Sequence, residues 1–322
     1  MLTADQQLDL HIGGMSIAIC SSNDRTRWLA ERKHGIGASE CAALIDAHPY
    51  MSRAELYAQK LGFETREDDD LEPEHLFWGS ELEGAIISGY GRRSSRQARK
   101  HGVLARHPEH AWMLCTLDAE TREYAEDNWH PLEVKNVTGF KVDDWAEGVP
   151  AHHQLQAQWQ MMVTGASVCT VAALIGGNRL VWDDVRRDEI AQRKLKYAAE
   201  KFLAQLATGE LPPDCIDGHA GTKRALLAMH EEDDGSTVQL DADLIEVADE
   251  LEQLKATEKA LKERVETLNN KIREAIGDAT LGVLPNYVAF SWKQQTKRSY
   301  TVAESTTRVL RRHEPKHGKK AG

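Results

Sequence analysis

Apolar residues between positions 23 and 218 repeat in two different patterns. From Trp78 to Tyr90 they recur every four positions, which is the spacing of one helix face. Other runs are shorter and are β-branched or alternating, which is typical of strands. Helices are therefore predicted over residues 38–45, 53–61, 78–90, 154–163 and 183–206, and strands over residues 112–117, 132–137 and 168–175. This mixture indicates an α/β domain.

A different pattern begins after the turn at residues 230–236. From Leu244 to Ala275 the heptad positions hold nine apolar residues out of ten, with Glu258 the exception. Neither Gly nor Pro interrupts this segment, so we predict one long helix with a coiled-coil-like seam. The seam suits packing on the chain's own domain and self-association equally well.

The alternation over residues 283–301 predicts a hairpin, after which the chain becomes basic. We therefore divide the chain into three parts. They are an N-terminal arm (1–22), a core domain (23–230), and an extension of long helix, hairpin and basic tail (236–322).

Composition places the chain among ordinary globular proteins. It has 322 residues, of which 41% are hydrophobic, enough for a substantial core. No apolar run approaches the roughly 20 residues of a membrane span, so no membrane association is expected. The five cysteines are scattered and form no CxxC pair, which favours reduced thiols and a cytoplasmic location.

The net charge of −11 by itself argues against a nucleic-acid partner, but it is an average. Residues 64–74 hold seven acidic side chains and one basic, which predicts a solvated loop. Residues 91–107 hold six basic and no acidic side chains, and the last 32 residues hold nine basic and two acidic. The stretch that contains Arg92, Arg93 and Arg96 is either a solvated surface or a track for the DNA backbone.

The candidate chemistry lies at the ends of two predicted strands. Glu133 and Lys135 are two positions apart, so they share one face of a strand, and Asp118 ends the preceding strand. Two carboxylates beside one space suit a hard divalent ion, to which the Val134 carbonyl could add an oxygen. Lys135 could orient a water or stabilise charge on phosphorus, as metal-assisted phosphodiester hydrolysis requires. An ordinary charged hairpin is the competing interpretation of this motif alone.

Four segments in order resemble the PD-(D/E)xK nuclease superfamily, and within it the YqaJ-like viral recombinase group that includes phage lambda exonuclease. They are residues 28–40 (WLAERKHGIGASE), 78–83 (WGSELE), Asp118 with 133–135 (EVK), and 148–165 (GVPAHHQLQAQWQMMVTG). The resemblance covers residues 25–180. It implies an α/β, restriction-endonuclease-like core, with a mixed central sheet flanked by helices; the long C-terminal helix is then an extension.

The resemblance also implies roles for single residues. Asp118 and Glu133 would be metal ligands, and Lys135 would be the catalytic lysine. Glu83 would be a helix acid that supports a second metal or its waters, and Gln156 a glutamine near the active centre. Gln156 and Gln160 are four apart and share a helix face.

Arg32 and Ser39 match the two positions that hold the 5′-phosphate in this family. A guanidinium forks onto phosphate oxygens, and the start of the predicted helix at residues 38–40 would favour an anion. No phosphate loop of the type GxxxxGK[ST] is present, so no nucleotide cofactor is expected.

The expected function is a Mg²⁺-dependent, ATP-independent 5′→3′ exonuclease acting on double-stranded DNA ends, with Mn²⁺ as a substitute metal. By resemblance it would be phage or prophage encoded, form a ring of three subunits in the bacterial cytoplasm, and supply 3′ single strands to a strand-annealing protein for recombination. Two alternatives remain. One is a structure-specific endonuclease with the same metal site; the other is a non-catalytic protein that binds DNA ends or a partner.

Overall fold

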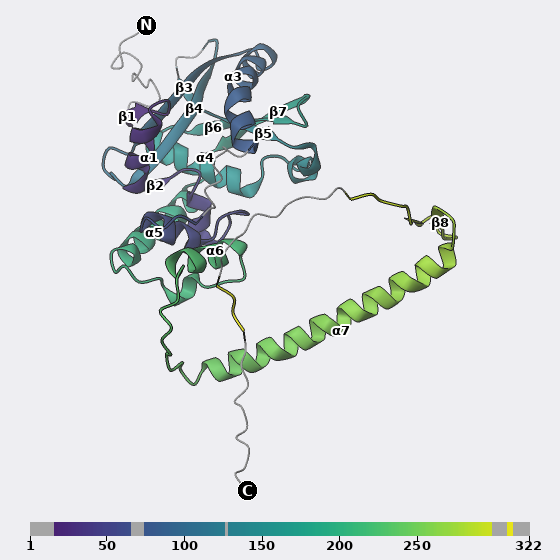
Figure 1. The fold of residues 1–322 in the computed structure, drawn as a ribbon. Coiled ribbons are helices and arrows are strands. Elements are labelled where there is room, and N and C mark those ends of the chain that lie inside the picture. The colour runs from purple at the N-terminus through teal and green to yellow at the C-terminus, as the bar shows by residue number, and fades with distance from the viewer. Residues whose placement is uncertain (1–15, 66–73, 126–127, 298–307, 312–322) are drawn as a thin grey trace. The chain divides into compact units, whose positions relative to one another are not determined.

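We describe residues 16–65, 74–125, 128–297 and 308–311 of a computed structural model of the chain. The chain divides into two units, Met1–Glu231 and Glu232–Gly322. Each is described by itself below (Figure 1).

The first unit is built on a seven-stranded sheet (Figure 1). Its strand order is β1-β3-β4-β5-β6-β7, and β2 pairs with β4 off this path. The β2–β4 and β5–β6 pairs are parallel and the other pairs antiparallel, so the sheet is mixed, as predicted. The strands are β1 (Ile17–Ser21), β2 (Ile36–Gly37), β3 (Arg96–Arg106), β4 (Met113–Glu123), β5 (His130–Val137), β6 (Val168–Ile175) and β7 (Arg179–Arg186).

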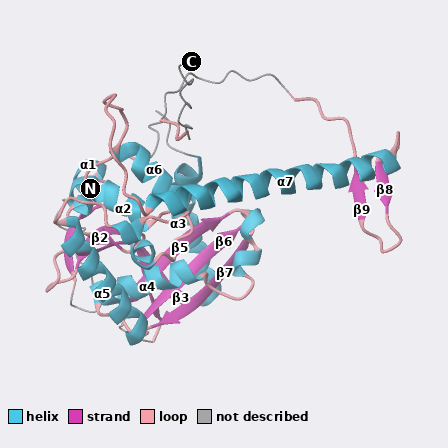
Figure 2. Cartoon of the chain, turned by 90° about the horizontal axis from the view of Figure 1, so that it is seen from below, coloured by secondary structure: helices cyan, strands magenta, loops and turns pink. Residues whose placement is uncertain are grey.

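Helices cover both faces of this sheet (Figures 1 and 2). Neighbouring residues of a strand point to opposite faces, and β6 shows the result. Ala172 packs with Tyr90 of α3, whereas Val171 belongs to the larger core that contains Trp159 of α4. The predicted flanking of a mixed sheet by helices is therefore confirmed. The helices of this unit are α1 (Arg25–Lys33), α2 (Arg53–Lys60), α3 (Glu74–Ser94), α4 (Ala151–Thr164), α5 (Glu189–Leu206) and α6 (Ala220–Met229), with short 3₁₀ turns at Cys41–Ile45, Gly139–Lys141, Asp143–Trp145 and Pro213–Cys215.

Several of the predicted elements differ from the structure in type or extent, and two of them show why. The segment 38–45 is not an α-helix, because only a 3₁₀ turn at Cys41–Ile45 forms there. The helix predicted over 183–206 begins at Glu189, where the Asp188 side chain accepts hydrogen bonds from the amides of Ile190 and Ala191. The residues before this cap extend β7, which pairs with β6 along its whole length.

Gly35 explains why the glycine-rich segment before β2 can run against β4. A Cβ at this position would collide with the backbone carbonyl of Trp112, and the neighbouring Ile36 amide donates to that same carbonyl at 2.8 Å. Ile36 and Gly37 then pair with Met113 and Leu114 of β4. This close approach brings the segment after β2 alongside β4.

The second unit contains α7 (Leu244–Ile276) and a short hairpin of β8 (Leu281–Val283) and β9 (Ala289–Ser291). The long C-terminal helix is therefore confirmed, and the hairpin is shorter than the predicted 283–301. Most of the predicted acidic loop (66–73) and much of the basic tail (298–307 and 312–322) lie outside the described residues. None of the helices in the described part of the chain has the length and apolarity that a membrane span needs.

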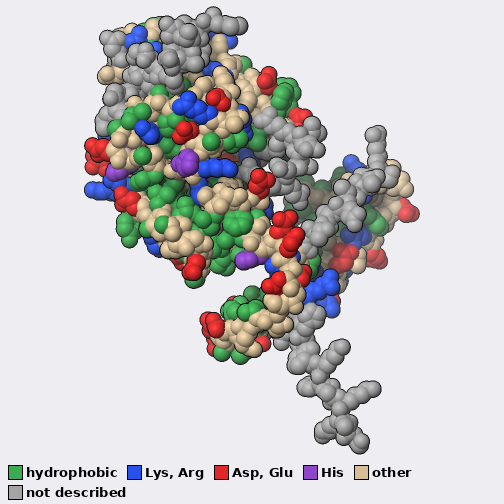
Figure 3. Space-filling model, turned by 60° about the vertical axis from the view of Figure 1, so that its left-hand side comes forward, with side chains coloured by type: hydrophobic (Ala, Val, Ile, Leu, Met, Phe, Trp, Pro, Cys, Tyr) green, Lys and Arg blue, Asp and Glu red, His purple; other side chains and the backbone are tan. Residues whose placement is uncertain are grey.

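Charged side chains form small groups on one face of the molecule. On the face shown in Figure 3, basic and acidic side chains are interspersed with apolar ones. The net charge of −11 thus gives little information about any one surface.

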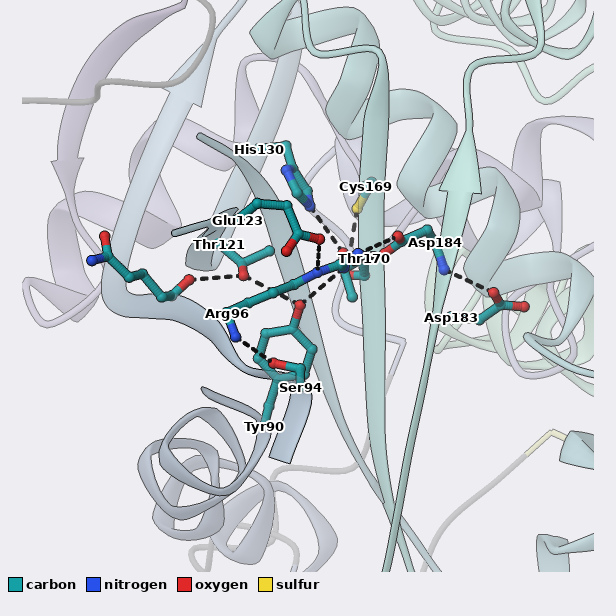
Figure 4. A network of polar contacts seen from close by, with 11 residues as sticks. Tyr90, Ser94, Arg96, Thr121, Glu123, His130, Cys169, Thr170, Asp183 and Asp184 are labelled. Carbon is teal, nitrogen blue, oxygen red and sulfur yellow. Dashed lines mark hydrogen bonds and ion pairs between the residues drawn. The ribbon is translucent and has the colours of Figure 1, made fainter. Parts of the chain in front are cut away.

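Arg96 ties three strands together near one end of the sheet (Figure 4). Its guanidinium donates to both carboxylate oxygens of Asp184 on β7, at 2.8 and 2.9 Å, and to Glu123 on β4 at 2.6 Å. Burial raises the pKa of the Asp184 carboxyl, but the hydrogen bonds from Arg96 and Thr170 outweigh it and hold that pKa below its ordinary value. Arg96 is therefore a structural cation.

We expect Arg96→Met to destabilise the protein by roughly 2–4 kcal/mol, because it leaves the Asp184 carboxylate without its cation. The loss should shrink as the pH falls through the pKa of Asp184, since a depressed carboxyl pKa contributes stability only above it. Urea denaturation at several pH values measures both effects. Arg92→Met is the control, because Arg92 is exposed and should change stability by less than about 0.5 kcal/mol. Equal effects of the two substitutions would contradict the structural role of Arg96.

Candidate active site

The site forms where β4 and β5 stop pairing. Their ladder runs from Thr121 and His130 to Ala119 and Leu132. The next residues on the two strands are Asp118 and Glu133. Beyond this point the Val134 amide donates to Asp118 Oδ2 at 3.0 Å, so the end of the ladder is closed by a carboxylate.

A pocket of about 390 Å³ opens at this place. It is lined by eight of the residues singled out from the sequence: Arg32, Ser39, Glu83, Asp118, Glu133, Val134, Lys135 and Gln156. The remaining lining residues are Trp28, Gly37, Ala38, Leu76, Gly79, Ser80, Leu104, Thr116 and Asn136. Side chains from α1, α3, α4 and the sheet thus meet at one site.

Glu133 is buried, and α4 holds both of its carboxylate oxygens. Gln156 Nε2 donates to Oε1 at 2.7 Å, and Gln160 Nε2 donates to Oε2 at 2.5 Å. Lys135 Nζ contacts Oε1 at 2.5 Å and also donates to Gln156 Oε1 at 3.1 Å. Gln158 points away, because its side chain bonds the backbone at Arg186 and Asp188. The i, i+4 pair of glutamines therefore fixes the orientation of one carboxylate.

The ionised form of Asp118 is electrostatically unfavourable in this pocket, and a bound cation would stabilise it. Burial raises the pKa of its carboxyl well above the usual range, and the nearby Glu133 and Glu83 carboxylates raise it further. Lys135 and the Val134 amide only partly offset this. Accumulated negative charge of this kind is a common feature of sites that bind divalent ions.

The donor chemistry fits Mg²⁺ with a small protein contribution. Among the described residues, no three His, Cys, Asp or Glu side chains lie close enough to hold a metal by themselves. Mg²⁺ is commonly held by one or two carboxylates, with waters and substrate phosphate oxygens completing its shell. Asp118 and Glu133 supply two such carboxylates in this pocket.

Lys135 is held as a cation. Burial lowers the pKa of its ammonium, but Glu133 and Asp118 outweigh burial and raise that pKa above the ordinary value. A charged ammonium donates hydrogen bonds and accepts no proton. Lys135 is therefore suited to holding a water or an anionic oxygen rather than to acting as a base in this state.

Glu83 lies on α3 and also lines the pocket. Its nearest cation is Lys100 Nζ, at 3.2 Å from Oε1, and Lys100 is exposed. Glu83 contributes to the charge felt by Asp118.

Arg32 lines another part of the same pocket, and neighbouring side chains hold its guanidinium in place. Its guanidinium contacts Glu40 Oε1 at 2.6 Å and Ser39 Oγ at 3.3 Å, and it stacks over Trp28 at 4.5 Å. The buried Glu40 also binds Lys60 Nζ at 2.7 Å and the Gly37 amide at 2.8 Å. Burial raises the pKa of Glu40, but Arg32 and Lys60 outweigh it and keep the carboxyl ionised.

The predicted basic track does not line this pocket. Arg92 and Arg93 lie in the last turn of α3 and are exposed. Arg96 donates to Asp184 and Glu123, and contact of these three arginines with DNA stays a prediction. Sequence spacing placed the three arginines in one group, but the end of α3 separates the first two from the third.

Two supporting residues, Glu40 and Lys60, escaped the sequence analysis. Glu40 stands at the start of an apolar run, and a carboxylate there needs a partner if it is buried. The position of Glu40 before an apolar run could therefore have indicated a buried ion pair. Nothing in the sequence linked it to Lys60, which lies 20 positions further along and meets Glu40 only through the fold.

The arrangement has the parts needed for metal-dependent phosphodiester hydrolysis: two carboxylates, an adjacent ammonium and a cation suited to phosphate. Comparison with known proteins agrees. Residues 27–167 match the family model of the YqaJ-like viral recombinase domain, which confirms the recognition made from the four motifs. The match to this family supports the interpretation of the chain as a nuclease.

The chain is also similar to individual proteins. The chain is 26% identical over 278 residues to the uncharacterized protein YqaJ of Bacillus subtilis (strain 168), covering 85% of this chain and 84% of that protein. An alkaline exonuclease from Laribacter hongkongensis matches with a TM-score of 0.47 and 22% identity, over 57% of this chain and 93% of its own. A phage-related exonuclease from Haemophilus somnus matches with a TM-score of 0.36 and 15% identity, over 49% and 81%.

We expect Asp118→Asn to stabilise the metal-free protein by about 1 kcal/mol or more at neutral pH. The folded state raises the pKa of this carboxyl, so ionisation at pH 7 opposes folding, and stability should rise as the pH falls through that raised pKa. Asn retains an oxygen that can accept from the Val134 amide. Thermal unfolding in EDTA checks the gain.

Addition of Mg²⁺ should raise the unfolding midpoint of the wild type and leave Asp118→Asn nearly unchanged. Glu81→Gln is the control, because it removes an exposed carboxylate of α3. If Asp118→Asn is less stable than the wild type in EDTA, then the ionised Asp118 carboxylate does not destabilise the folded protein.

Proposed function

We propose that the chain is a Mg²⁺-dependent, ATP-independent exonuclease that degrades the 5′ strand of a double-stranded DNA end. One observation carries the proposal. The pocket that contains Asp118, Glu133 and Lys135 also contains Arg32 and Ser39, so a phosphate-holding group and a hydrolytic group share one small space. An enzyme that removes nucleotides from an end needs both.

Each residue has a role that follows from its contacts. Glu133, fixed by two glutamines, and Asp118 would hold the metal, with the Val134 carbonyl as a further oxygen. The metal, when bound, lowers the pKa of a water and offsets charge on the phosphate. The Lys135 ammonium orients that water or stabilises the developing negative charge.

Arg32 would bind the terminal 5′-phosphate. Glu40 neutralises one positive charge, while Arg32 and Lys60 supply two, which leaves a net attraction for an anion at this end of the pocket. The Ser39 hydroxyl, 3.3 Å from the guanidinium, could donate to the same phosphate. This pairing would set the polarity of digestion.

The same proposal includes the wider role of the enzyme. Its 3′ single-stranded product would pass to a strand-annealing protein in phage-type recombination in the bacterial cytoplasm. Retention on DNA without ATP would come from a ring of subunits, and Mn²⁺ should replace Mg²⁺ because it accepts the same oxygen ligands.

Linear duplex labelled at either the 5′ or the 3′ end tests the activity. With Mg²⁺ we expect early release of the 5′ label and late release of the 3′ label, and none of either with EDTA. Asp118→Ala and Lys135→Ala should lower the rate by roughly 10²-fold or more while DNA binding persists.

Glu81→Gln serves as the control and should digest DNA at the wild-type rate. Early release of the 3′ label would reverse the proposed polarity. Cleavage of a covalently closed circle would favour an endonuclease, and full activity in Lys135→Ala would remove that residue from the chemistry.

Arg32→Ala should reduce digestion of 5′-phosphorylated ends by roughly 10- to 100-fold, because a charge-assisted hydrogen bond to phosphate is lost. Ends with a 5′-hydroxyl should be affected much less. Arg25→Ala is the matched control, since Arg25 stacks over the same Trp28 ring at 4.6 Å but does not line the pocket. Equal losses on both kinds of end would exclude the phosphate contact.

A further inference from the structure

Two cations share one buried carboxylate beside the pocket. Glu40 lies between β2 and the 3₁₀ turn that follows it. Its Oε1 contacts Arg32 Nη2 at 2.6 Å, and its Oε2 contacts Lys60 Nζ at 2.7 Å. We call Arg32, Glu40 and Lys60 the charge triad. With two positive charges and one negative, the triad has a net charge of +1.

Lys60 is the member of the triad that has no direct access to a ligand in the pocket. Its side chain is only 6% exposed and does not line the pocket. The ammonium is held on two sides, because it also donates to the backbone carbonyl of Arg32 at 3.0 Å. That carbonyl lies in the last turn of α1, where a helix leaves carbonyls without an internal partner. Lys60 therefore acts on a bound phosphate only through Glu40 and Arg32.

Arg32 keeps donors for a ligand. Its contacts with Glu40 and Ser39 both use Nη2. Within the part of the chain that the structure describes, Nη1 and Nε make no hydrogen bond to a protein acceptor. The side chain is 22% exposed and lines the pocket. Because a guanidinium presents its donors in a fixed fork, two nitrogens remain for a phosphate while the third holds Glu40.

We propose that Lys60 is a positioning residue that sets the preference of the enzyme for 5′-phosphorylated DNA ends. Its ammonium neutralises Glu40, so the charge of Arg32 remains available to the phosphate. The inference rests on the proposed function, in which Arg32 binds the terminal phosphate. Without Lys60, one carboxylate would face one guanidinium, and the pair would have no net charge to attract an anion.

The burial of Lys60 supports a role beyond joining two helices. Burial lowers the pKa of its ammonium, and Glu40 only partly offsets this effect. An apolar side chain at this position would hold α2 against α1 without the cost of desolvating a charge. Groups whose pKa is displaced both by burial and by a specific charged partner are common at functional sites.

Lys60→Met tests this role, because Met has a side chain of similar length without the charge. The measured quantity is kcat/KM for release of the first nucleotide, taken as the ratio between 5′-phosphorylated and 5′-hydroxyl duplex ends. We expect the ratio to fall by roughly threefold to tenfold, through a higher KM on phosphorylated ends and with little change in kcat. Lys33→Met is the control, because it removes an exposed lysine of α1 and should leave the ratio unchanged.

A double variant separates charge balance from packing. Lys60→Met combined with Glu40→Gln removes one cation and one anion, so Arg32 again supplies a net charge of +1. Gln retains an oxygen that can accept from Arg32 Nη2. We expect the ratio to return to within about twofold of the wild type, because the two substitutions act on one network and are not additive. A purely structural role predicts instead that the double variant is impaired most.

Glu40→Gln alone covers the case in which Lys60→Met folds poorly. This variant leaves two cations and no anion, so the ratio should be at least as high as that of the wild type. A lower ratio would overturn the proposal, since Arg32 would then need the carboxylate more than it needs an uncompensated charge.

The outcomes separate this inference from the function on which it rests. The phosphate contact stands if the wild type prefers phosphorylated ends and Arg32→Ala abolishes that preference. An unchanged ratio in Lys60→Met, or no recovery in the double variant, would then overturn the role of Lys60 alone. A wild type that digests both kinds of end equally would overturn the phosphate contact and the role of Lys60 together.

Discussion

The buried carboxylate of Glu133 is the constraint on which the rest of the first unit depends. A carboxylate away from water must have both oxygens hydrogen-bonded, and here α4 meets this need with two glutamines one turn apart. The helix must therefore lie against β5 in one register. That register places Gln156 beside Lys135 and sets the wall of the pocket. A purely apolar interface would leave the helix with less precise placement.

The pocket divides its charge between two regions. Asp118 and Glu133 concentrate negative charge where β4 and β5 separate, whereas Arg32 and Lys60 concentrate positive charge around Glu40. The first region holds carboxylates under mutual repulsion, and the second holds cations that are already half neutralised. A metal ion and a phosphate would each complete one region. In the first region, the raised pKa of Asp118 indicates that its ionised carboxylate opposes folding.

Much of the fold followed from local patterns. The helical spacing from Trp78 to Tyr90 and the apolar run of β6 are strong signals, because each element buries one continuous face. The start of α5 was missed because the residues of β7 also fit a helical pattern, and the cap at Asp188 decides between the two. The segment 38–45 forms only a 3₁₀ turn at Cys41–Ile45. Its N-terminal side is instead held by the hydrogen bond from the Gly37 amide to Glu40 and by the pairing of β2 with β4.

The sequence alone determined the residue types at the site and their spacing. Asp118, the Glu133–Lys135 pair and the i, i+4 glutamines can be recognised because strand and helix geometry fix which neighbours share a face. Only the tertiary structure decided which charges pair. It paired Glu40 with Lys60 and Arg96 with Asp184, and it ended the pairing of β4 with β5 at Asp118. Those outcomes depend on contacts between distant segments, and local periodicity carries no information about them.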